Sequence, residues 1–436
     1  MFANLLGFLM RTTATQPKRI SDPFIIGIFA VGSEKACYYD AICDWFFTKV
    51  TRVSTMTFDL DGKNFSFVLK LFKGDLNFLR KLLGSNVNGI FRCSWCSISM
   101  DATDMISYRY HWSHQQKSLS YLCSATTQEL ERYGVEKPDW LPKTASELKE
   151  RGLDKTEVGF DPLHMLSGFL KLTFQEITEN KGISFDAARF QEHLQTSGSS
   201  LRKSISKKTT SDFNSSDWRK FFLLFETTLL PFINDNPSKA ICQKLCLLIN
   251  ELSYLLYVPS SPTTNQRRRY LLSSYLLFMH ITEHFRQLLK TLYTHYLISH
   301  ICERFIEADF ELSAPQASTE SGESFFARLK KDYRNSNHHT GSREASTIAK
   351  YTYRLFFPHS TNHSRSEFSE LYDDFASKRS HILCLSFSSL LETDNWNCFL
   401  QILHHFKFSK EGFISGSQSN SKDYISIQFN CGELAK

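Results

Sequence analysis

Long apolar runs are missing from this sequence. No stretch of about 18 consecutive apolar residues occurs, so we expect no membrane-spanning helix. Glycine and proline are scarce, with 18 Gly and 11 Pro among 436 residues, which excludes collagen-like and low-complexity chains. Hydrophobic residues nevertheless make up 42% of the chain and charged residues 22%, so wholesale disorder is excluded as well. What remains is a helix-rich globular chain, long enough for two or three domains.

A strong excess of one charge is lacking too. Lys and Arg total 51 against 45 Asp and Glu, a balance that is compatible with nucleic-acid binding but does not establish it. Eleven Cys in so long a chain disfavour a disulfide scaffold and favour a reducing compartment with a few metal-binding cysteines. The apolar first ten residues contain no basic region, so we interpret them as a buried or irregular start rather than a signal peptide.

Strand and helix patterns alternate over residues 1–92. The continuous apolar run Phe24–Val31 predicts a buried strand, and apolar residues at helical spacing predict a helix within 34–50. Two alternating segments, 55–61 and 64–72, flank a turn at Gly62 and predict a hairpin. We expect Phe24–Val31 and 64–72 to share one sheet.

Helical periodicity dominates after residue 92, and a further helix is predicted at 320–333. Two Ser/Thr/Lys-rich stretches, 197–216 and 259–269, are predicted to be exposed loops, the second including the basic run Arg267 to Arg269. The main periodic segments are 163–177, 218–232, 239–257 and 270–301. These patterns together predict an α+β chain that is mostly helical.

The sharpest local motif is Cys93-Ser94-Trp95-Cys96, because two thiolates at this spacing can bind one side of a tetrahedral Zn²⁺. Two buried core cysteines are the plain alternative. The nearby pair His111 and His114 would complete a finger-like site, although its histidine spacing is shorter than usual. The remote pair His295 and His300, on a long predicted helix and its end, would complete the site equally well. Spacing alone leaves both choices open.

Two acidic residues fit one specific mechanism. Asp75 follows a predicted strand and Glu320 begins a predicted helix. Each taken singly is explained by solvation or helix capping. Carboxylates that converge from separate elements on two Mg²⁺ are, however, what metal-dependent phosphoryl transfer requires.

Four segments, in the same order and with matching gaps, resemble the catalytic core of the V(D)J recombination-activating (RAG) recombinases and the related Transib transposases. The resemblance covers roughly residues 22–357. The segments are the strand ending in Phe72-Lys73-Gly74-Asp75 with CSWC eighteen residues later; FDPLHMLSGFLKLTFQEITEN from Phe160, which looks like the family's D-x-L-H helix; His295 with His300; and Glu320-Ser321-Gly322 before a basic helix.

The resemblance implies a partial RNase H-like (DDE transposase) core interrupted by a long helical zinc-binding insertion. The implied domains are a truncated RNase H-like half with the second catalytic Asp (1–92), the insertion (93–300), a returning segment with the catalytic-Glu helix (301–357) and a C-terminal tail region (358–436). It places the zinc ligands on Cys93, Cys96, His295 and His300, which displaces His111 and His114. Four protein ligands leave no open position, so this zinc would be structural.

The implied catalytic residues are Asp75 and Glu320, with Mg²⁺ or Mn²⁺ as the catalytic metal, while Asp161 and His164 are supporting candidates close to the active site. The implied DNA-binding face beside Glu320 comprises Arg328, Lys330, Lys331 and Arg334.

One catalytic residue of the family has no counterpart here. The family's first catalytic Asp lies on a strand that should precede Phe24, and the first 20 residues contain neither Asp nor Glu. We therefore expect an N-terminally truncated recombinase with an incomplete triad, inactive as written: a gene fragment, a decayed transposon copy or a domesticated copy.

The alternative is a non-catalytic, zinc-stabilised module that binds DNA or protein. The implied partners are double-stranded DNA, a second copy of the chain and a second recombinase subunit, without a membrane, and the implied location is the nucleus.

Overall fold

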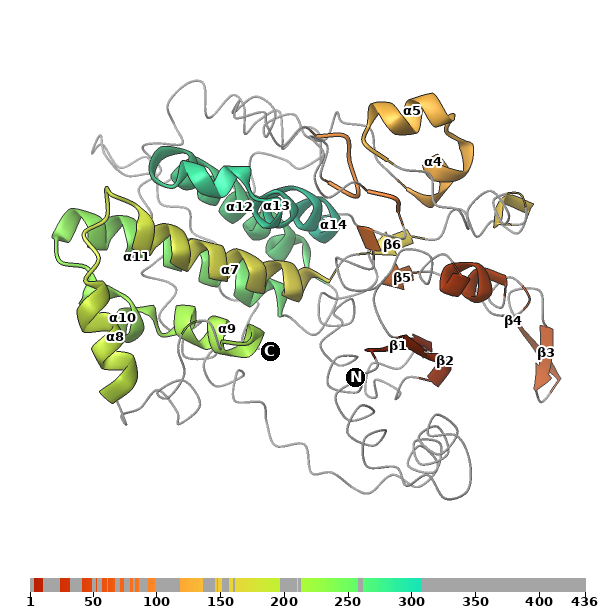
Figure 1. Ribbon diagram of the computed structural model, residues 1–436, viewed down its shortest axis with the longest axis horizontal. Helices are drawn as coiled ribbons and strands as arrows, with labels where there is room; N and C mark the ends of the chain where they lie inside the picture. The colour runs from red at the N-terminus through yellow and green to blue at the C-terminus, as the bar shows by residue number, and fades with distance from the viewer. Residues whose placement is uncertain are drawn as a thin grey trace, which may run out of the picture. The chain divides into compact units, whose positions relative to one another are not determined.

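The computed structural model of the chain describes residues 4–10, 24–31, 41–48, 52, 57–60, 62–66, 71–73, 79–80, 83–85, 93–98, 118–135, 146, 148–150, 157–159, 161–196, 210, 213–257 and 262–306 (Figure 1). This part is mostly helical, as the periodicity predicts. Its labelled elements fall into two compact units, β1–β6 with α4 and α5 in one and α7–α14 in the other. No helix within the described ranges is both long and apolar enough to span a membrane.

The first sheet pairs two strands near the N-terminus. β2 (Phe24–Val31) confirms the predicted strand. Its antiparallel partner β1 (Asn4–Met10) lies where the sequence pattern predicts no regular element. The register runs from Asn4 opposite Val31 to Met10 opposite Phe24, with one irregularity after Phe8.

The predicted hairpin is present but shorter than expected. β3 (Thr57–Leu60) and β4 (Lys63–Ser66) pair antiparallel. Gly62 closes the turn with φ of +74°, a left-handed conformation that favours glycine, and its N–H donates to Asp59 Oδ1 at 3.0 Å.

The third strand pair joins distant parts of the sequence. β5 (Leu71–Lys73) runs parallel to β6 (Glu157–Gly159), so residues 71–73 form a strand separate from β4. The six strands that the structure describes form three two-stranded sheets, and the sheet expected to join Phe24–Val31 with 64–72 is not seen among them.

Two short helices and one further helical stretch accompany these strands. α4 (Leu119–Ser124) starts at Ser118, whose hydroxyl accepts from Tyr121 N. α5 (Thr127–Arg132) starts at a capping box between Thr126 and Glu129. Residues 41–48, inside the predicted helix 34–50, are helical and bury an apolar face.

The second unit consists of helices. They are α7 (Pro162–Glu179), α8 (Ala187–Thr196), α9 (Ser215–Leu223), α10 (Phe225–Thr228), η4 (Leu230–Phe232), α11 (Asn236–Leu256), α12 (Thr264–His284), η5 (Arg286–Lys290), α13 (Leu292–His295), η6 (Tyr296–His300) and α14 (Ile301–Ile306). The predictions at 163–177 and 239–257 are confirmed within a few residues.

Two predicted helices are interrupted. The segment 218–232 breaks at Leu224 and Leu229, and Pro231 has no N–H to donate within a continuing helix. The segment 270–301 is interrupted after His284 by a 3-10 turn; helix resumes at Leu292 and continues without a break through α13, η6 and α14.

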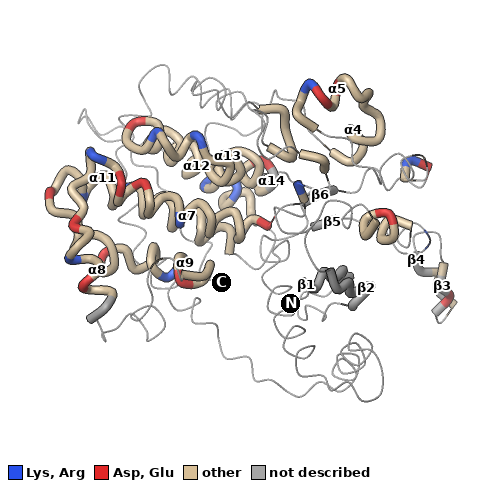
Figure 2. Tube along the Cα trace, in the orientation of Figure 1, with Lys and Arg blue, Asp and Glu red and all other residues tan. Residues whose placement is uncertain are grey.

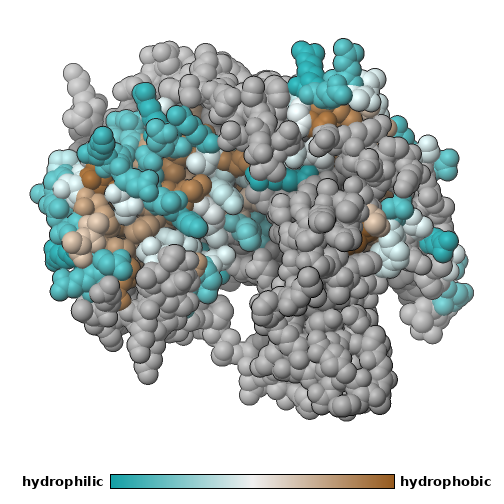
Figure 3. Space-filling view, viewed as in Figure 1, coloured by the Kyte–Doolittle hydropathy of each residue, from teal (hydrophilic) through white to brown (hydrophobic). Residues whose placement is uncertain are grey.

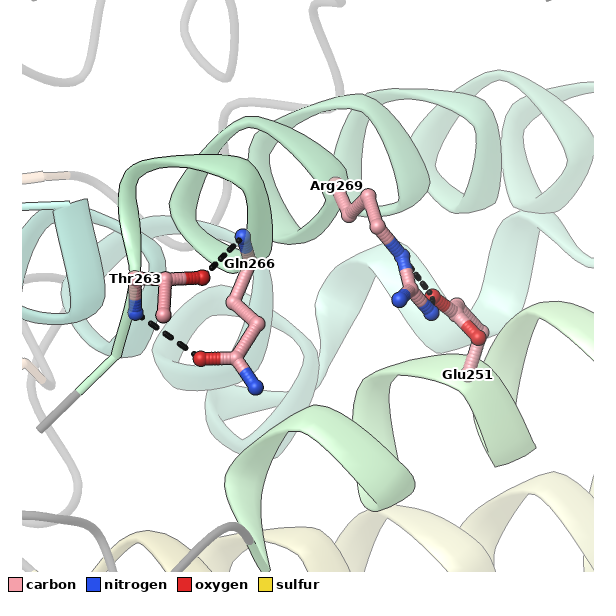
Figure 4. A network of polar contacts seen from close by, with 4 residues as sticks. All are labelled: Glu251, Thr263, Gln266 and Arg269. Carbon is pink, nitrogen blue, oxygen red and sulfur yellow. Dashed lines mark hydrogen bonds and ion pairs between the residues drawn. The ribbon is translucent and has the colours of Figure 1, made fainter. Parts of the chain in front are cut away.

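The predicted loop at 259–269 is wrong in its second half. Thr263 caps α12, where its hydroxyl accepts from Gln266 N at 3.2 Å and Gln266 Oε1 accepts from Thr263 N at 2.8 Å (Figure 4). The basic run Arg267 to Arg269 is therefore helical, and Arg267 and Arg269 are buried. Serine, threonine and proline before this run mark a helix start as well as they mark a loop.

The buried Arg269 pairs with Glu251 of α11 (Figure 4). Arg269 Nε donates to Glu251 Oε1 at 2.9 Å, and Nη2 contacts the same oxygen. Both side chains are 2% exposed. Removing one partner would leave a buried charge uncompensated, which typically costs about 3–5 kcal/mol. The pair therefore fixes how α11 packs against α12.

Aromatic side chains fill much of the helical unit. Phe174 of α7 contacts Phe190, Trp218 and Phe221, with ring centroids 5.3–5.5 Å apart. On the face drawn in Figure 3, hydrophilic side chains cover much of the described surface of these helices, and hydrophobic ones show between them. The many phenylalanines of the sequence thus contribute directly to this core.

Candidate metal centre

Four buried side chains converge in the described part of the chain. One ligand atom from each of Cys93, Cys96, His295 and His300 lies within 4.8 Å of the other three. None of the four residues is more than 3% exposed. The described ranges contain no second group of three or more His, Cys, Asp or Glu arranged in this way.

The cysteine half of the cluster lies on a tight bend. Residues 93–98 are all buried, and the bend at Ser94 and Trp95 separates the two cysteines. The backbone N–H of Trp95 donates to Cys93 Sγ at 3.4 Å. An N–H directed at sulfur stabilises the thiolate, which is the form that binds metal.

The histidine half depends on a π-turn. In an α-helix, side chains five residues apart point about 140° away from each other. His295 ends α13, and η6 is a π-helix that closes with the N–H of Ile301 donating to Tyr296 O. This wider turn brings His295 and His300 to one side, with ring centroids 4.7 Å apart and planes at 80°.

A carboxylate lies behind one of the two imidazoles. Glu303 Oε2 of α14 is 3.9 Å from His300 Nδ1, and the Glu303 side chain is 22% exposed. Metal-binding histidines commonly face a carboxylate with the ring nitrogen that does not bind the metal. This arrangement leaves His300 Nε2 as the nitrogen available to a metal.

The four residues fit a zinc ion. Zn²⁺ binds sulfur at about 2.3 Å and imidazole nitrogen at about 2.0–2.1 Å, so its tetrahedral ligand atoms lie about 3.3–3.8 Å apart. The present separations of up to 4.8 Å would need to close by about 1 Å. Thiolate and imidazole ligands favour Zn²⁺ over Mg²⁺ or Ca²⁺, which prefer oxygen. Two thiolates also neutralise the ion, which suits a buried site.

Comparison with known proteins gives no family. No protein-family model matches the chain, and no curated protein matches it either. The metal centre therefore rests on the geometry of its own residues.

The structure brings the CxxC motif together with the remote histidine pair, the set that the resemblance implies. His111 and His114, the nearby pair, lie outside the described residues. So do all the residues proposed for catalysis and DNA binding: Asp75, Glu320, Arg328, Lys330, Lys331 and Arg334.

The two supporting candidates on the D-x-L-H helix are described. Asp161 is buried directly before α7, and His164 lies half-buried in the first turn of that helix. Neither belongs to the cluster.

Glu303 is not predicted from the sequence. Its only signal is its position three residues after His300, which places the two side chains on one face of a helix. With many acidic residues in the chain, that spacing alone does not single it out.

Proposed function

We propose that this protein is a zinc-stabilised DNA-binding protein descended from RAG- and Transib-type recombinases. One observation carries the proposal: four buried side chains with the donor atoms that zinc prefers come together at the positions that the resemblance assigns to zinc. Each of the two pairs alone is a weak motif. Their convergence across about 200 residues of sequence has no simple explanation as ordinary core packing.

The proposed zinc is structural. Cys93, Cys96, His295 and His300 supply all four ligands of a tetrahedral ion, so no position remains for a reacting water. Binding would close a loop of about 200 residues, which removes conformational entropy from the unfolded chain.

The DNA-processing part of the proposal rests on the resemblance. Asp75 and Glu320 would hold catalytic Mg²⁺ or Mn²⁺, and the basic residues after Glu320 would contact DNA phosphates in the nucleus. Because the resemblance assigns only two of three carboxylates to this sequence, we propose that the polypeptide printed here binds double-stranded DNA without cleaving it. A module that binds only protein is the competing function.

The metal is tested by elemental analysis of the purified chain. We expect about one Zn²⁺ per chain, and Co²⁺ substitution should give the absorption bands of a tetrahedral site with thiolate ligands. Cys93→Ser and His295→Ala should each lose metal and lower the free energy of unfolding, whereas His111→Ala should do neither. Loss of metal in His111→Ala with retention in His295→Ala would show that the nearby histidines are the ligands.

A further inference from the structure

Gly168 lies inside α7, where glycine is costly. Glycine in a helix interior is about 1 kcal/mol less favourable than alanine. A Cβ added at Gly168 would, however, lie 2.6 Å from Cδ1 and from Cζ of Tyr293 and would meet Cε1 of the same ring. Real Cβ atoms essentially never come this close to a non-bonded atom. Glycine at this position therefore lets the Tyr293 ring lie directly on the backbone of α7.

Tyr293 lies two residues before the metal-binding His295. It belongs to α13, which follows the N-cap Thr291 and continues directly into η6 and α14. The Thr291 hydroxyl accepts from Thr294 N at 3.3 Å, and the two threonine hydroxyls lie 2.8 Å apart. α7 packs against α13, and also against the neighbouring η5 and η6. The start of α13 is thus fixed by its N-cap, and its packing against α7 is fixed by the ring of Tyr293.

Such support matters because a π-turn is rarely stable by itself. Its hydrogen-bond pattern occurs mostly as single turns inserted in α-helices, often at functional sites. α13, η6 and α14 follow one another without a break, so this π-turn is inserted in one helical stretch from Leu292 to Ile306, and that stretch could instead adopt a regular α-helix. A rotation of α13 about its axis would turn His295 away from His300.

We propose that the contact between Gly168 and Tyr293 positions His295 and His300 for metal binding. The inference rests on the proposed zinc site and gives the α7 helix a role in it. Gly168 and Tyr293 are positioning residues, because neither supplies a metal ligand. The ring of Tyr293, and not its hydroxyl, does the positioning.

The test measures Co²⁺ and Zn²⁺ affinity in the 436-residue chain. Gly168→Ala should weaken metal binding about 10- to 100-fold, the range seen when groups behind metal ligands are changed. Helix propensity alone would not predict weaker metal binding, since alanine stabilises α7 relative to glycine. Gly182→Ala is a control for adding a methyl group elsewhere, because Gly182 lies in the turn after α7 and a Cβ there meets only Asn180 Oδ1, at 3.2 Å. This control should bind metal like the wild type.

A double-mutant cycle locates the effect. Tyr293→Ala should weaken metal binding by a similar factor, and Tyr293→Phe should leave it unchanged. Adding Gly168→Ala to Tyr293→Ala should cost nothing further, because the new methyl group then meets no ring. The Co²⁺ absorption spectrum of each variant reports whether the ligand geometry has changed as well as the affinity.

The outcomes separate the positioning role from the metal site itself. If the wild-type chain binds no stoichiometric metal, the proposed zinc site fails and the positioning role fails with it. If the wild type binds metal and Gly168→Ala binds it equally well, only the positioning role is overturned. Equal losses from Gly168→Ala with and without the Tyr293 ring would also overturn it, since α7 would then act by another route. Should Gly168→Ala fail to fold, Tyr293→Ala compared with Tyr293→Phe decides the question.

Discussion

Glu303 follows His300 by about one helical turn, and its carboxylate lies 3.9 Å from His300 Nδ1. A negative charge at this place favours the tautomer with a proton on Nδ1, which leaves the Nε2 lone pair for a metal. The same charge raises the electron density of the ring and so strengthens the metal bond. A residue that contacts no metal can therefore set the affinity of the site.

We predict that Glu303→Gln lowers Zn²⁺ affinity about 10- to 100-fold while the chain stays folded. Metal affinity is measured by competition with a chromogenic chelator. Glu283→Gln is the matched control, because Glu283 Oε1 lies 3.5 Å from Nε2 of His284, a histidine outside the cluster. Equal affinities for Glu303→Gln and the wild type would show that the carboxylate does not act on the ligand.

The sequence predicts the cysteine half of the candidate metal site better than the histidine half. Cys93 and Cys96 form a local motif whose spacing suits a metal by itself. His295 and His300 are five residues apart, which on a regular α-helix would separate them, so their pairing depends on the π-turn. Nothing in the sequence predicts where that turn falls. Only the resemblance selects these histidines over His111 and His114.

The long helices α11 and α12 pack against each other and bury the imidazole of His280 between them. His280 of α12 is 3% exposed, and its Nε2 lies 2.9 Å from the carbonyl oxygen of Ile241 on α11. A carbonyl only accepts, so Nε2 carries the proton and Nδ1 has none. Burial lowers the pKa of His280 to about 4; the bond to Ile241 opposes this shift, and Lys244 and His284 add to it.

We predict that His280 makes the protein less stable in acid. Between pH 6.5 and about 4 the unfolded chain binds a proton at His280 and the folded chain does not. The free energy of unfolding should therefore fall as the pH drops through this window, by up to about 3 kcal/mol. Urea unfolding of the wild type and of His280→Gln at pH 7, 5.5 and 4.5 checks this.

The prediction is tested by the difference in the free energy of unfolding between the wild type and His280→Gln at each pH. All other groups are common to both proteins, so their contributions cancel in the comparison. The stability advantage of the wild type should shrink toward pH 4. An advantage that is the same at all three pH values would contradict the assignment.

Element boundaries show where sequence patterns succeed and fail. α7 and α11 were predictable because long apolar periodicity and, at α11, the cap Asp235 with Pro237 agree. The start of α12 was not predictable from the sequence, because its run of arginines suggests an exposed segment. Glu251, eighteen residues earlier, gives Arg269 a buried partner that no local pattern reveals.

For the whole molecule, the sequence predicts the helix content and the local β3–β4 hairpin, but not the pairing of strands that are distant in the chain. β5 and β6 are three residues each and lie far apart in the chain, and no periodic pattern shows that these two segments pair with each other. Parallel pairing across such a distance is set by tertiary packing. The RNase H-like core therefore stays a proposal, although Lys73, two residues before Asp75, ends β5.

Charge is mixed on the helices that the structure describes. Figure 2 shows Lys and Arg interspersed with Asp and Glu along these helices. A mixture of both signs along these helices gives little net attraction to DNA. DNA affinity is therefore expected to depend on the basic residues after Glu320, which lie outside the described residues.

We predict that this polypeptide binds double-stranded DNA in a salt-sensitive manner without cutting it. If Arg328, Lys330, Lys331 and Arg334 each contact a phosphate, the logarithm of the association constant should fall with the logarithm of salt concentration with a slope of about −3 to −4. Lys330→Ala combined with Lys331→Ala should make that slope shallower by about 2. The double change Lys171→Ala and Lys181→Ala removes the same charge from exposed positions of the helical unit and should leave the slope unaltered.

Cleavage is assayed on the same DNA in Mg²⁺ and in Mn²⁺. Two carboxylates hold at most part of a two-metal site, and a water that replaces the third brings no negative charge, so we expect intact DNA. Cleavage that disappears in Asp75→Ala would mean that a further carboxylate of this chain completes the site. Salt-insensitive binding, or none, would instead favour a module that recognises protein, because phosphate contacts displace counterions whatever the DNA sequence.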